Sequence, residues 1–239
     1  MILERGGYVV IFDVLSEETG TAKVKTYPHP ERAFYFKTDI SDYDSVHAAT
    51  TAAMGVIPKG SLAGGVHCAA IAPGRTWSHQ LKDSVSAFAK VLQVNVYGTF
   101  VVDACIADAI NSQYPDNGPF AERVKEERGV IINIASAVAR PVPARCITYG
   151  PSKTAVLGIS TGMADFLGPF GIRCCSVSPA VVASNLMGPD RLVSVSPLKC
   201  VDSHSPTSRP SLRLLPSSPA VSPTPRRWAT ASSTSLRTR

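Results

Sequence analysis

Tyr149 and Lys153 are the two residues whose types and spacing could do chemistry, in the segment "TYGPSKTAV". They are four positions apart, so on a helix they share one face. A free tyrosine has a pKa near ~10. One cation at ~5 Å, in an effective dielectric of ~20, favours the phenolate by ~3 kcal/mol, which corresponds to about two pKa units. The pair could therefore exchange a proton with an alcohol or carbonyl oxygen, although an ordinary pair on a helix surface has the same spacing.

Two more polar residues add to this interpretation. Ser136 ends the apolar run "GVIINIAS", 13 residues before Tyr149. Ligands of doubly wound folds lie at the carboxyl ends of the strands, so this position favours a site residue. Asn95 lies in "NVYGTF", inside a long helical pattern. An asparagine inside a helix is more often a packing or capping residue, and both roles stay open for Asn95.

The elements that must position these residues alternate along the chain. Five short apolar runs are typical of strands buried on both faces, at 8–14, 33–40, 62–71, 129–136 and 172–179. Helical spacing occupies 41–54, 82–110 and 148–171, and the polar stretch 111–129 is expected to be an exposed excursion. Strands that alternate with helices predict an α/β fold with a doubly wound, Rossmann-like parallel sheet.

The two ends of the chain differ from this pattern. The segment "LERGG" before the first strand looks like the end of a helix, with Gly6 and Gly7 as its stop signal. Half of residues 192–239 are Ser, Pro or Thr, and no apolar periodicity remains there. We therefore predict a folded domain over 1–191, followed by a disordered Ser/Pro/Arg-rich tail over 192–239.

Charge and composition exclude several classes of function. The formal net charge of +6 comes from the tail, which contains seven basic residues and one acidic residue. Residues 1–191 are therefore neutral overall, and they lack the surplus of positive charge that binding to nucleic acid requires. The five scattered histidines argue against a metal site, and no apolar stretch reaches the ~18 residues of a membrane span. The six cysteines form no CxxC pair and several lie in apolar runs, which predicts reduced, buried thiols in an intracellular protein.

A set of ordered motifs points to one family. The segments "HCAAIAP", "NVYGTF", "GVIINIAS", "YGPSK" and "GIRCCSVSPAVVASNL" resemble, in this order, the short-chain dehydrogenases/reductases, over roughly residues 2–190. The stretch from "RGVIINIAS" to "GIRCCSVSPA" is most similar to the type 2 3-hydroxyacyl-CoA dehydrogenase branch. The resemblance implies an oxidoreductase that moves a hydride between NAD and a secondary alcohol or ketone, such as a 3-hydroxyacyl-CoA or a hydroxysteroid. It also implies a homodimer or tetramer formed through the two long helices, in the cytoplasm or the mitochondrion.

The resemblance gives each catalytic candidate a role. Tyr149 would give or take the hydroxyl proton, and Lys153 would lower the pKa of that tyrosine. Ser136 would hold the substrate oxygen by a hydrogen bond. Asn95 would help to bind a water molecule linked to Lys153.

The resemblance also implies a set of cofactor-binding residues. Asp13 ends the first strand of this chain, where a carboxylate accepts hydrogen bonds from the adenosine ribose and favours NAD over NADP, although such an aspartate is also a common turn former. The full set is Asp13, Asp39, Ile40, Ala69, Ala70, Tyr149, Lys153, Pro179 and Ala180. His67, Ala70 and Ala180 depart from the family pattern, which has Asn, Gly and Gly there. For His67 a hydrogen-bonded structural role is favoured over a ligand role.

One family feature is expected to be missing. Relatives begin with a strand and a glycine-rich TGxxxGxG turn, and "LERGG" looks like the end of the helix that follows them. The predicted fold therefore lacks the first strand, which lies in the middle of the sheet, and also the last strand. Two hypotheses remain: an NAD-dependent oxidoreductase, or a non-catalytic fragment or pseudoenzyme scaffold that has lost its dinucleotide-binding loop.

Overall fold

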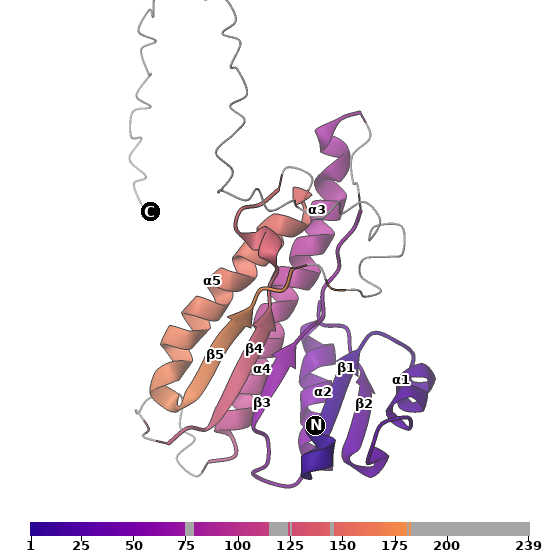
Figure 1. The fold of residues 1–239 in the computed structure, drawn as a ribbon, viewed down its shortest axis with the longest axis vertical. Helices are drawn as coiled ribbons and strands as arrows, with labels where there is room; N and C mark the ends of the chain where they lie inside the picture. The colour runs from indigo at the N-terminus through magenta and orange to yellow at the C-terminus, as the bar shows by residue number, and fades with distance from the viewer. Residues whose placement is uncertain (75–78, 115–123, 125, 144–145, 181, 183–239) are drawn as a thin grey trace, which may run out of the picture. The chain divides into compact units, whose positions relative to one another are not determined.

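The computed structural model describes residues 1–74, 79–114, 124, 126–143, 146–180 and 182 (Figure 1). The predicted tail and most of the polar excursion lie outside these residues, so the domain boundary at 191 stays a prediction. Within the described part, parallel strands alternate with helices, which confirms the predicted α/β class.

The N-terminal part contains two parallel strands, β1 (Val9–Asp13) and β2 (Ala33–Lys37), paired from Val9 with Ala33 to Asp13 with Lys37. A short 3-10 helix, Leu3–Arg5, precedes β1 and ends at Gly6, whose φ of 85° is the left-handed conformation that glycine adopts without strain. The predicted helix end at "LERGG" is therefore present.

Helix α1 (Glu17–Val24) connects these strands and has no counterpart among the predicted elements. Its only strong sequence signal is the N-cap, where the Ser16 hydroxyl accepts a hydrogen bond from the Thr19 N–H. A 3-10 turn, Pro30–Arg32, leads into β2, and helix α2 (Tyr43–Val56) follows it.

The second sheet has the order β3-β4-β5 and is parallel throughout. Its strands are Gly64–His67, Gly129–Ile134 and Ile172–Val177. One long helical stretch joins β3 to the segment before β4, built from a 3-10 turn (Leu81–Ser84), α3 (Val85–Leu92), a π-helical turn (Gln93–Tyr97) and α4 (Gly98–Asn111). A 3-10 turn, Ala137–Ala139, follows β4. Helix α5 (Tyr149–Leu167) and the 3-10 turn Gly168–Phe170 then lead to β5.

The core of this sheet lies on one face. Ile110 of α4, Ile131 of β4, Leu167 of α5 and Ile172 of β5 are at most 1% exposed and pack together. Burial alternates along β4, as expected when one face of a strand is covered. The prediction of strands buried on both faces is therefore wrong for the described part, where α4 and α5 cover one face and Cys175 on the other is exposed.

The two sheets are separate within the described residues, because no ladder of hydrogen bonds joins β1 to β3. Helix packing connects them instead: Val46 of α2 and Val101 of α4 belong to one core cluster. Gly98, the first residue of α4, lets this helix lie close to Ile40 in the segment before α2, since a Cβ at Gly98 would lie 2.9 Å from the side chain of Ile40. The predicted break in the middle of the sheet is thus present in the structure.

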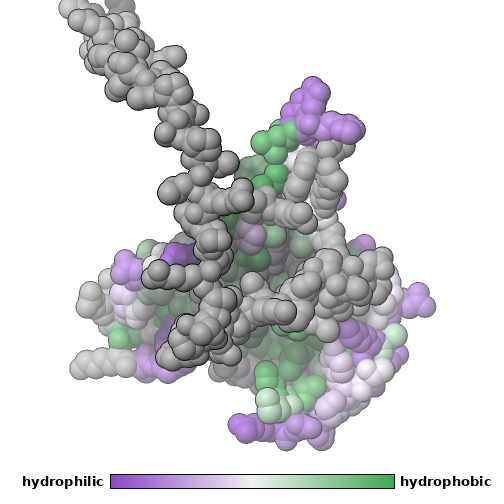
Figure 2. Space-filling view, turned by 45° about the horizontal axis from the view of Figure 1, so that its top comes forward, coloured by the Kyte–Doolittle hydropathy of each residue, from purple (hydrophilic) through white to green (hydrophobic). Residues whose placement is uncertain are grey.

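The helical stretch Leu81–Asn111 is, by length and composition, apolar enough to cross a membrane. The sequence prediction had found no such segment. Its α4 portion buries Val101, Val102, Cys105 and Ile110 against neighbouring elements, as the core helix of a globular domain does. Its outer end carries hydrophilic residues beside exposed hydrophobic ones (Figure 2).

The cysteines are only partly as predicted. Cys105 and Cys174 are buried, but Cys68 and Cys175 are exposed and Cys146 is half-buried. The apolar runs around them misled the prediction, because alternate residues of a strand point to opposite faces and one face of this sheet is open.

Candidate active site

Three of the four predicted catalytic residues come together beyond the carboxyl end of β4. Ser136 follows the strand and caps the next turn, where its hydroxyl accepts a 3.4 Å hydrogen bond from the Val138 N–H. Tyr149 is the first residue of α5, and Lys153 lies one turn further along the same helix. The Lys153 Nζ atom lies 5.7 Å from the centroid of the Tyr149 ring, so the predicted shared helix face is observed.

Lys153 is held firmly in place. Its side chain reaches from α5 to β4, where Nζ donates a 2.6 Å hydrogen bond to the carbonyl oxygen of Ile134. The residue is only 3% exposed. Burial lowers the pKa of Lys153 to about 8, and the charge of Cys68 opposes that effect. Lys153 is therefore mainly protonated at pH 7.

The pKa of Tyr149 differs from the sequence prediction. Burial raises it above the ordinary value of 10.0, a side-chain hydrogen bond with Ser136 lowers it, and the charge of Cys146 raises it. The expected lowering by Lys153 does not dominate, because desolvation of the phenolate outweighs the other influences. Tyr149 therefore carries its proton at neutral pH.

Asn95 has a structural position. It is 1% exposed and lies in the π-helical turn between α3 and α4. Its Oδ1 atom accepts a 2.8 Å hydrogen bond from the Ile71 N–H, and its Nδ2 atom donates to the Ile71 carbonyl at 2.9 Å and to the Ser152 Oγ at 3.0 Å. Asn95 thus ties the segment after β3 to α5 one residue before Lys153, and π-helical turns are frequent at functional sites.

Four of the predicted cofactor-binding residues follow the carboxyl ends of β3 and β5: Ala69, Ala70, Pro179 and Ala180. The Pro179 carbonyl accepts a 2.9 Å hydrogen bond from the Ala137 N–H, next to Ser136. Ala180 follows Pro179 and is exposed. Ala69 and Ala70 follow β3 and are half-buried. Their positions agree with a shared binding site at this edge, while their role in binding stays a prediction.

The other predicted cofactor-binding residues lie at or after the ends of β1 and β2: Asp13, Asp39 and Ile40. Asp13 ends β1 and is exposed, and its Oδ1 atom accepts a 3.2 Å hydrogen bond from the Leu15 N–H. Asp39 accepts hydrogen bonds from the Ser41 N–H and hydroxyl, at 2.9 and 2.6 Å, which lower its pKa. Ile40 is 6% exposed and belongs to the core cluster with α2 and α4, so its side chain serves packing.

His67 ends β3 and is 6% exposed. Burial and the charge of Lys153 lower its pKa to about 4, and a hydrogen bond with the backbone of Ala69 acts against them. The imidazole is therefore neutral at pH 7. The hydrogen bond with Ala69 agrees with the predicted structural role of His67. The Nε2 atom, however, has no hydrogen-bond partner among the described residues, and that role does not account for it.

Sequence reasoning missed a buried polar group beneath the site. Asp103 of α4 is fully buried, and its Oδ2 atom accepts a 2.7 Å hydrogen bond from the Asn133 Nδ2, which also lies 3.1 Å from the Ser160 Oγ. Burial raises the pKa of Asp103 to about 6, and the hydrogen bond with Asn133 lowers it. An acidic residue inside an apolar helical pattern was the available signal. Among the described residues, no group of His, Cys, Asp and Glu is arranged to hold a metal.

The fold and the site define a parallel α/β protein with a Ser-Tyr-Lys group beyond the carboxyl end of a strand. A profile of the short chain dehydrogenase family matches residues 1–192. The chain belongs to this family of oxidoreductases.

Named relatives agree with the predicted branch. The 3-hydroxyacyl-CoA dehydrogenase type-2 of Rattus norvegicus is 29% identical over 189 residues, which cover 78% of this chain and 68% of the relative. The (3R)-3-hydroxyacyl-CoA dehydrogenase of Homo sapiens is 36% identical over 119 residues, which cover 50% of this chain and 40% of the relative.

Solved structures share the fold. NAD+-bound xylitol dehydrogenase superposes with a TM-score of 0.63 at 21% identity, covering 77% of this chain and 65% of that one. A 3-ketoacyl-(acyl-carrier-protein) reductase from Brucella melitensis, complexed with NADH, gives 0.61 at 22% identity and covers 74% and 66%. The chain thus spans about two thirds of the length of these structures.

Proposed function

We propose that this site transfers a hydride between NAD and a secondary alcohol or ketone. The observation that carries the proposal is the group formed by Ser136, Tyr149 and Lys153, with Nζ 5.7 Å from the centroid of the Tyr149 ring and the Ser136 side chain close enough to lower the pKa of Tyr149. A half-buried phenol beside a serine hydroxyl can exchange a proton with a substrate oxygen that the serine holds.

The residues present fit two ends of a dinucleotide. At one end the exposed carboxylate of Asp13 can accept hydrogen bonds from a ribose, which favours NAD over NADP. At the other end, the unpartnered Nε2 atom of the buried His67 is an orphaned polar group that lies near Lys153. The bound nicotinamide supplies the hydride acceptor or donor.

The protonation states favour one direction at neutral pH. Tyr149 carries its proton there, so it is ready to donate to the oxygen of a ketone. Lys153 is mainly charged and held by Ile134, where it favours negative charge that develops on the substrate oxygen. Ketone reduction therefore needs no prior loss of a proton, whereas alcohol oxidation first needs the Tyr149 phenolate.

The relatives guide the substrate class. Two of them are named for 3-hydroxyacyl-CoA compounds, so we infer that the substrate is a 3-hydroxyacyl-CoA or the matching 3-ketoacyl-CoA. A hydroxysteroid is the second class. The test is NADH consumption by the 239-residue chain with acetoacetyl-CoA. Turnover supports the proposal, and a folded chain without turnover contradicts it.

A second candidate function is a non-catalytic scaffold. The observation in its favour is that β1 and β3 are not joined in one sheet, while the described turns from a strand to a helix contain no run of glycines to bind a pyrophosphate. Calorimetric titration of NAD separates the two. Micromolar binding with cooperative unfolding supports the enzyme, and cooperative unfolding without binding supports the scaffold.

The partner proposed for the helices is a second copy of the chain. A groove of about 440 Å³ lies between α4 and α5, lined by Phe100, Ala104, Ala107, Asp108, Ile159, Gly162, Met163, Phe166 and Leu167. Phe100 and Phe166 are more than half exposed, so the groove offers aromatic surface that an equivalent face could cover. Sedimentation should show a dimer that Phe166→Glu dissociates. A wild-type monomer would contradict the proposal.

A further inference from the structure

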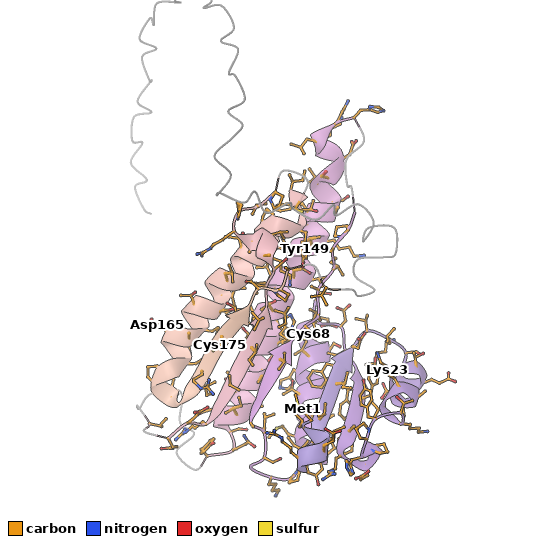
Figure 3. All side chains as sticks on the ribbon, viewed as in Figure 1. Met1, Lys23, Cys68, Tyr149, Asp165 and Cys175 are labelled. Atoms are coloured by element: carbon orange, nitrogen blue, oxygen red, sulfur yellow. The ribbon has the colours of Figure 1, made fainter. Side chains whose placement is uncertain are left out.

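Asp103, Asn133 and Ser160 meet in the interior of the domain. They belong to three different elements, α4, β4 and α5, and each is at most 3% exposed. Ser160 lies on α5 between Tyr149 and Asp165, the two residues of this helix that Figure 3 labels. One group of polar side chains therefore joins two helices and the strand beneath them.

Both hydrogens of the Asn133 amide nitrogen are used in this group. Nδ2 donates to the Asp103 Oδ2 atom at 2.7 Å and to the Ser160 Oγ atom at 3.1 Å. Ser160 accepts this bond because its own hydroxyl hydrogen goes to the carbonyl oxygen of Val156, at 2.8 Å. The two bonds fix which end of the Asn133 side chain is the nitrogen, so the Oδ1 atom at the other end can only accept.

Two oxygen atoms of the group lack a donor. Among the described residues, the buried Asp103 Oδ1 and Asn133 Oδ1 atoms have no hydrogen-bond partner. They belong to the two residues that already share the 2.7 Å bond. An unpaired acceptor in the interior is costly, and an unpaired carboxylate charge costs more. One hydrogen placed between the two oxygens would satisfy both.

The surroundings of Asp103 offer no positive charge to stabilise a carboxylate. On the strands, burial raises the pKa of Cys174 to about 12, and His67 is neutral at pH 7 because its pKa is lowered to about 4. The other titratable residues of α4 are Cys105 and Asp108, neither of which is a cation. The buried residues of α2, which packs on α4, include no titratable side chain.

Helix α5 has one basic residue, Lys153, and it is engaged elsewhere. Its Nζ atom donates to the carbonyl of Ile134 at 2.6 Å. Among the described residues, no ion pair includes Asp103. Asp103 can therefore reach a satisfied state most directly by keeping its own proton.

We propose that Asp103 and Asn133 form a buried proton-binding site that fastens α4 to β4. Asp103 is the neutral acid, and its Oδ1 atom donates the bound hydrogen to the Asn133 Oδ1 atom. Together with the bond from Nδ2 to Oδ2, this completes a ring of two hydrogen bonds. When the proton leaves for solvent, the second bond is lost and a negative charge remains beside an amide oxygen, which weakens the joint.

The electrostatics of Asp103 agree with this arrangement. Burial raises its pKa to about 6, and the bond from the Asn133 nitrogen lowers it. A hydrogen bond made only by the acid form acts in the same direction as burial.

The joint lies next to the anchor of the candidate site. Asn133 directly precedes Ile134, whose carbonyl holds Lys153, and Ser160 lies two turns further along α5 than Lys153. Binding of the proton needs neither NAD nor turnover, so the inference stands apart from the proposed hydride transfer.

The experiment compares urea unfolding of the full chain with Asp103→Asn and Asp103→Leu at pH 4.5 and pH 8. An amide at position 103 can make both bonds to Asn133 without a proton. Asp103→Asn should therefore match the wild-type chain at pH 4.5, and at pH 8 its folding equilibrium constant should be about a hundredfold larger, as two pKa units imply. Asp103→Leu leaves the Asn133 amide unpaired and should be the least stable of the three at pH 4.5.

Asp165→Asn, at an exposed site on α5, is the control for these measurements. It should follow the wild-type chain at both pH values. An Asp103→Asn variant that is less stable than the wild-type chain at pH 8 would overturn the proposal, because the carboxylate charge would then be needed.

A crystal structure of the wild-type chain at pH 5 covers the case in which the variants do not fold. Two acceptor oxygens approach within about 2.5 to 3.0 Å only when a hydrogen lies between them. We expect this separation between the Asp103 Oδ1 and Asn133 Oδ1 atoms. A water molecule or a cation between the two oxygens would overturn the proposal.

Discussion

The ammonium nitrogen of Lys153 lies 5.7 Å from the centroid of the Tyr149 ring, and the Lys153 side chain is buried while Tyr149 is half-buried. Burial disfavours the charged form of each, so it raises the pKa of Tyr149 and lowers that of Lys153 to about 8. The two values therefore move towards each other, and at pH 7 the pair consists of a neutral phenol and an ammonium.

Tyr149→Phe should lower NAD-linked turnover by roughly 10²- to 10⁴-fold, because it removes the proton-transfer group and little else. Cofactor affinity, measured by calorimetry, should change little. Tyr43→Phe is the control, since Tyr43 is exposed on α2 and stacks on His47. Turnover in Tyr149→Phe equal to that of the control would refute the assignment.

Ketone reduction should be constant from about pH 6 to pH 7.5 and decline as the pH rises through about 8. The reason is that Lys153 loses its proton there, while Tyr149 keeps its proton to higher pH. The pH profile of kcat/KM measures this. Lys153→Arg, which stays charged, should move the decline to higher pH. An unmoved decline in an active Arg variant would show that another group titrates.

Asn95→Ala should destabilise the chain by about 2 to 4 kcal/mol, because it leaves the backbone N–H and carbonyl of Ile71 without their partner. Urea unfolding measures the free energy. Gln93→Ala is a suitable control, since Gln93 is exposed and its amide donates one 3.1 Å hydrogen bond to Ser41; its loss should be below about 1 kcal/mol. Similar losses in the two variants would contradict the structural role of Asn95.

Asp103→Asn should abolish a fall in the free energy of unfolding that the wild-type chain shows between about pH 4 and pH 6. The folded pKa of Asp103 is about 6 and the ordinary value is 3.8, so the folded state holds a proton that the unfolded state has released. Stability therefore falls by about 3 kcal/mol as the pH rises from about 4 to 6, and stays lower above that. Urea unfolding of Asp103→Asn should lack this fall, while Asp165→Asn, at an exposed site on α5, should keep it.

His67→Asn should remove a fall in the free energy of unfolding that the wild-type chain shows as the pH decreases from 6.5 to about 4. The folded pKa of His67 is about 4 and the ordinary value is 6.5, so the unfolded state binds a proton that the folded state refuses. Stability falls by about 3 kcal/mol as the pH decreases from 6.5 to 4. His47→Asn, at an exposed site on α2, is the control. An unchanged acid limb in His67→Asn would mean that His67 is protonated in the folded state.

Secondary structure was predictable wherever local pattern and tertiary packing agree. The apolar runs at 129–136 and 172–179 contain β4 and β5, and the helical pattern at 148–171 contains α5. Helix α1 was missed because its eight residues include few apolar ones and bury only Gly20 and Val24. Short polar helices leave little periodic signal apart from their caps.

By itself, the sequence determined that Tyr149 and Lys153 share a helix face and that Ser136 follows a strand, because both relations depend on residues close in the chain. Only the tertiary structure decided which groups lose water. The burial of Asp103, the exposure of Cys68 and the raised pKa of Tyr149 depend on elements distant in the chain. Desolvation is set by all neighbouring atoms in space, which no local spacing of residues encodes.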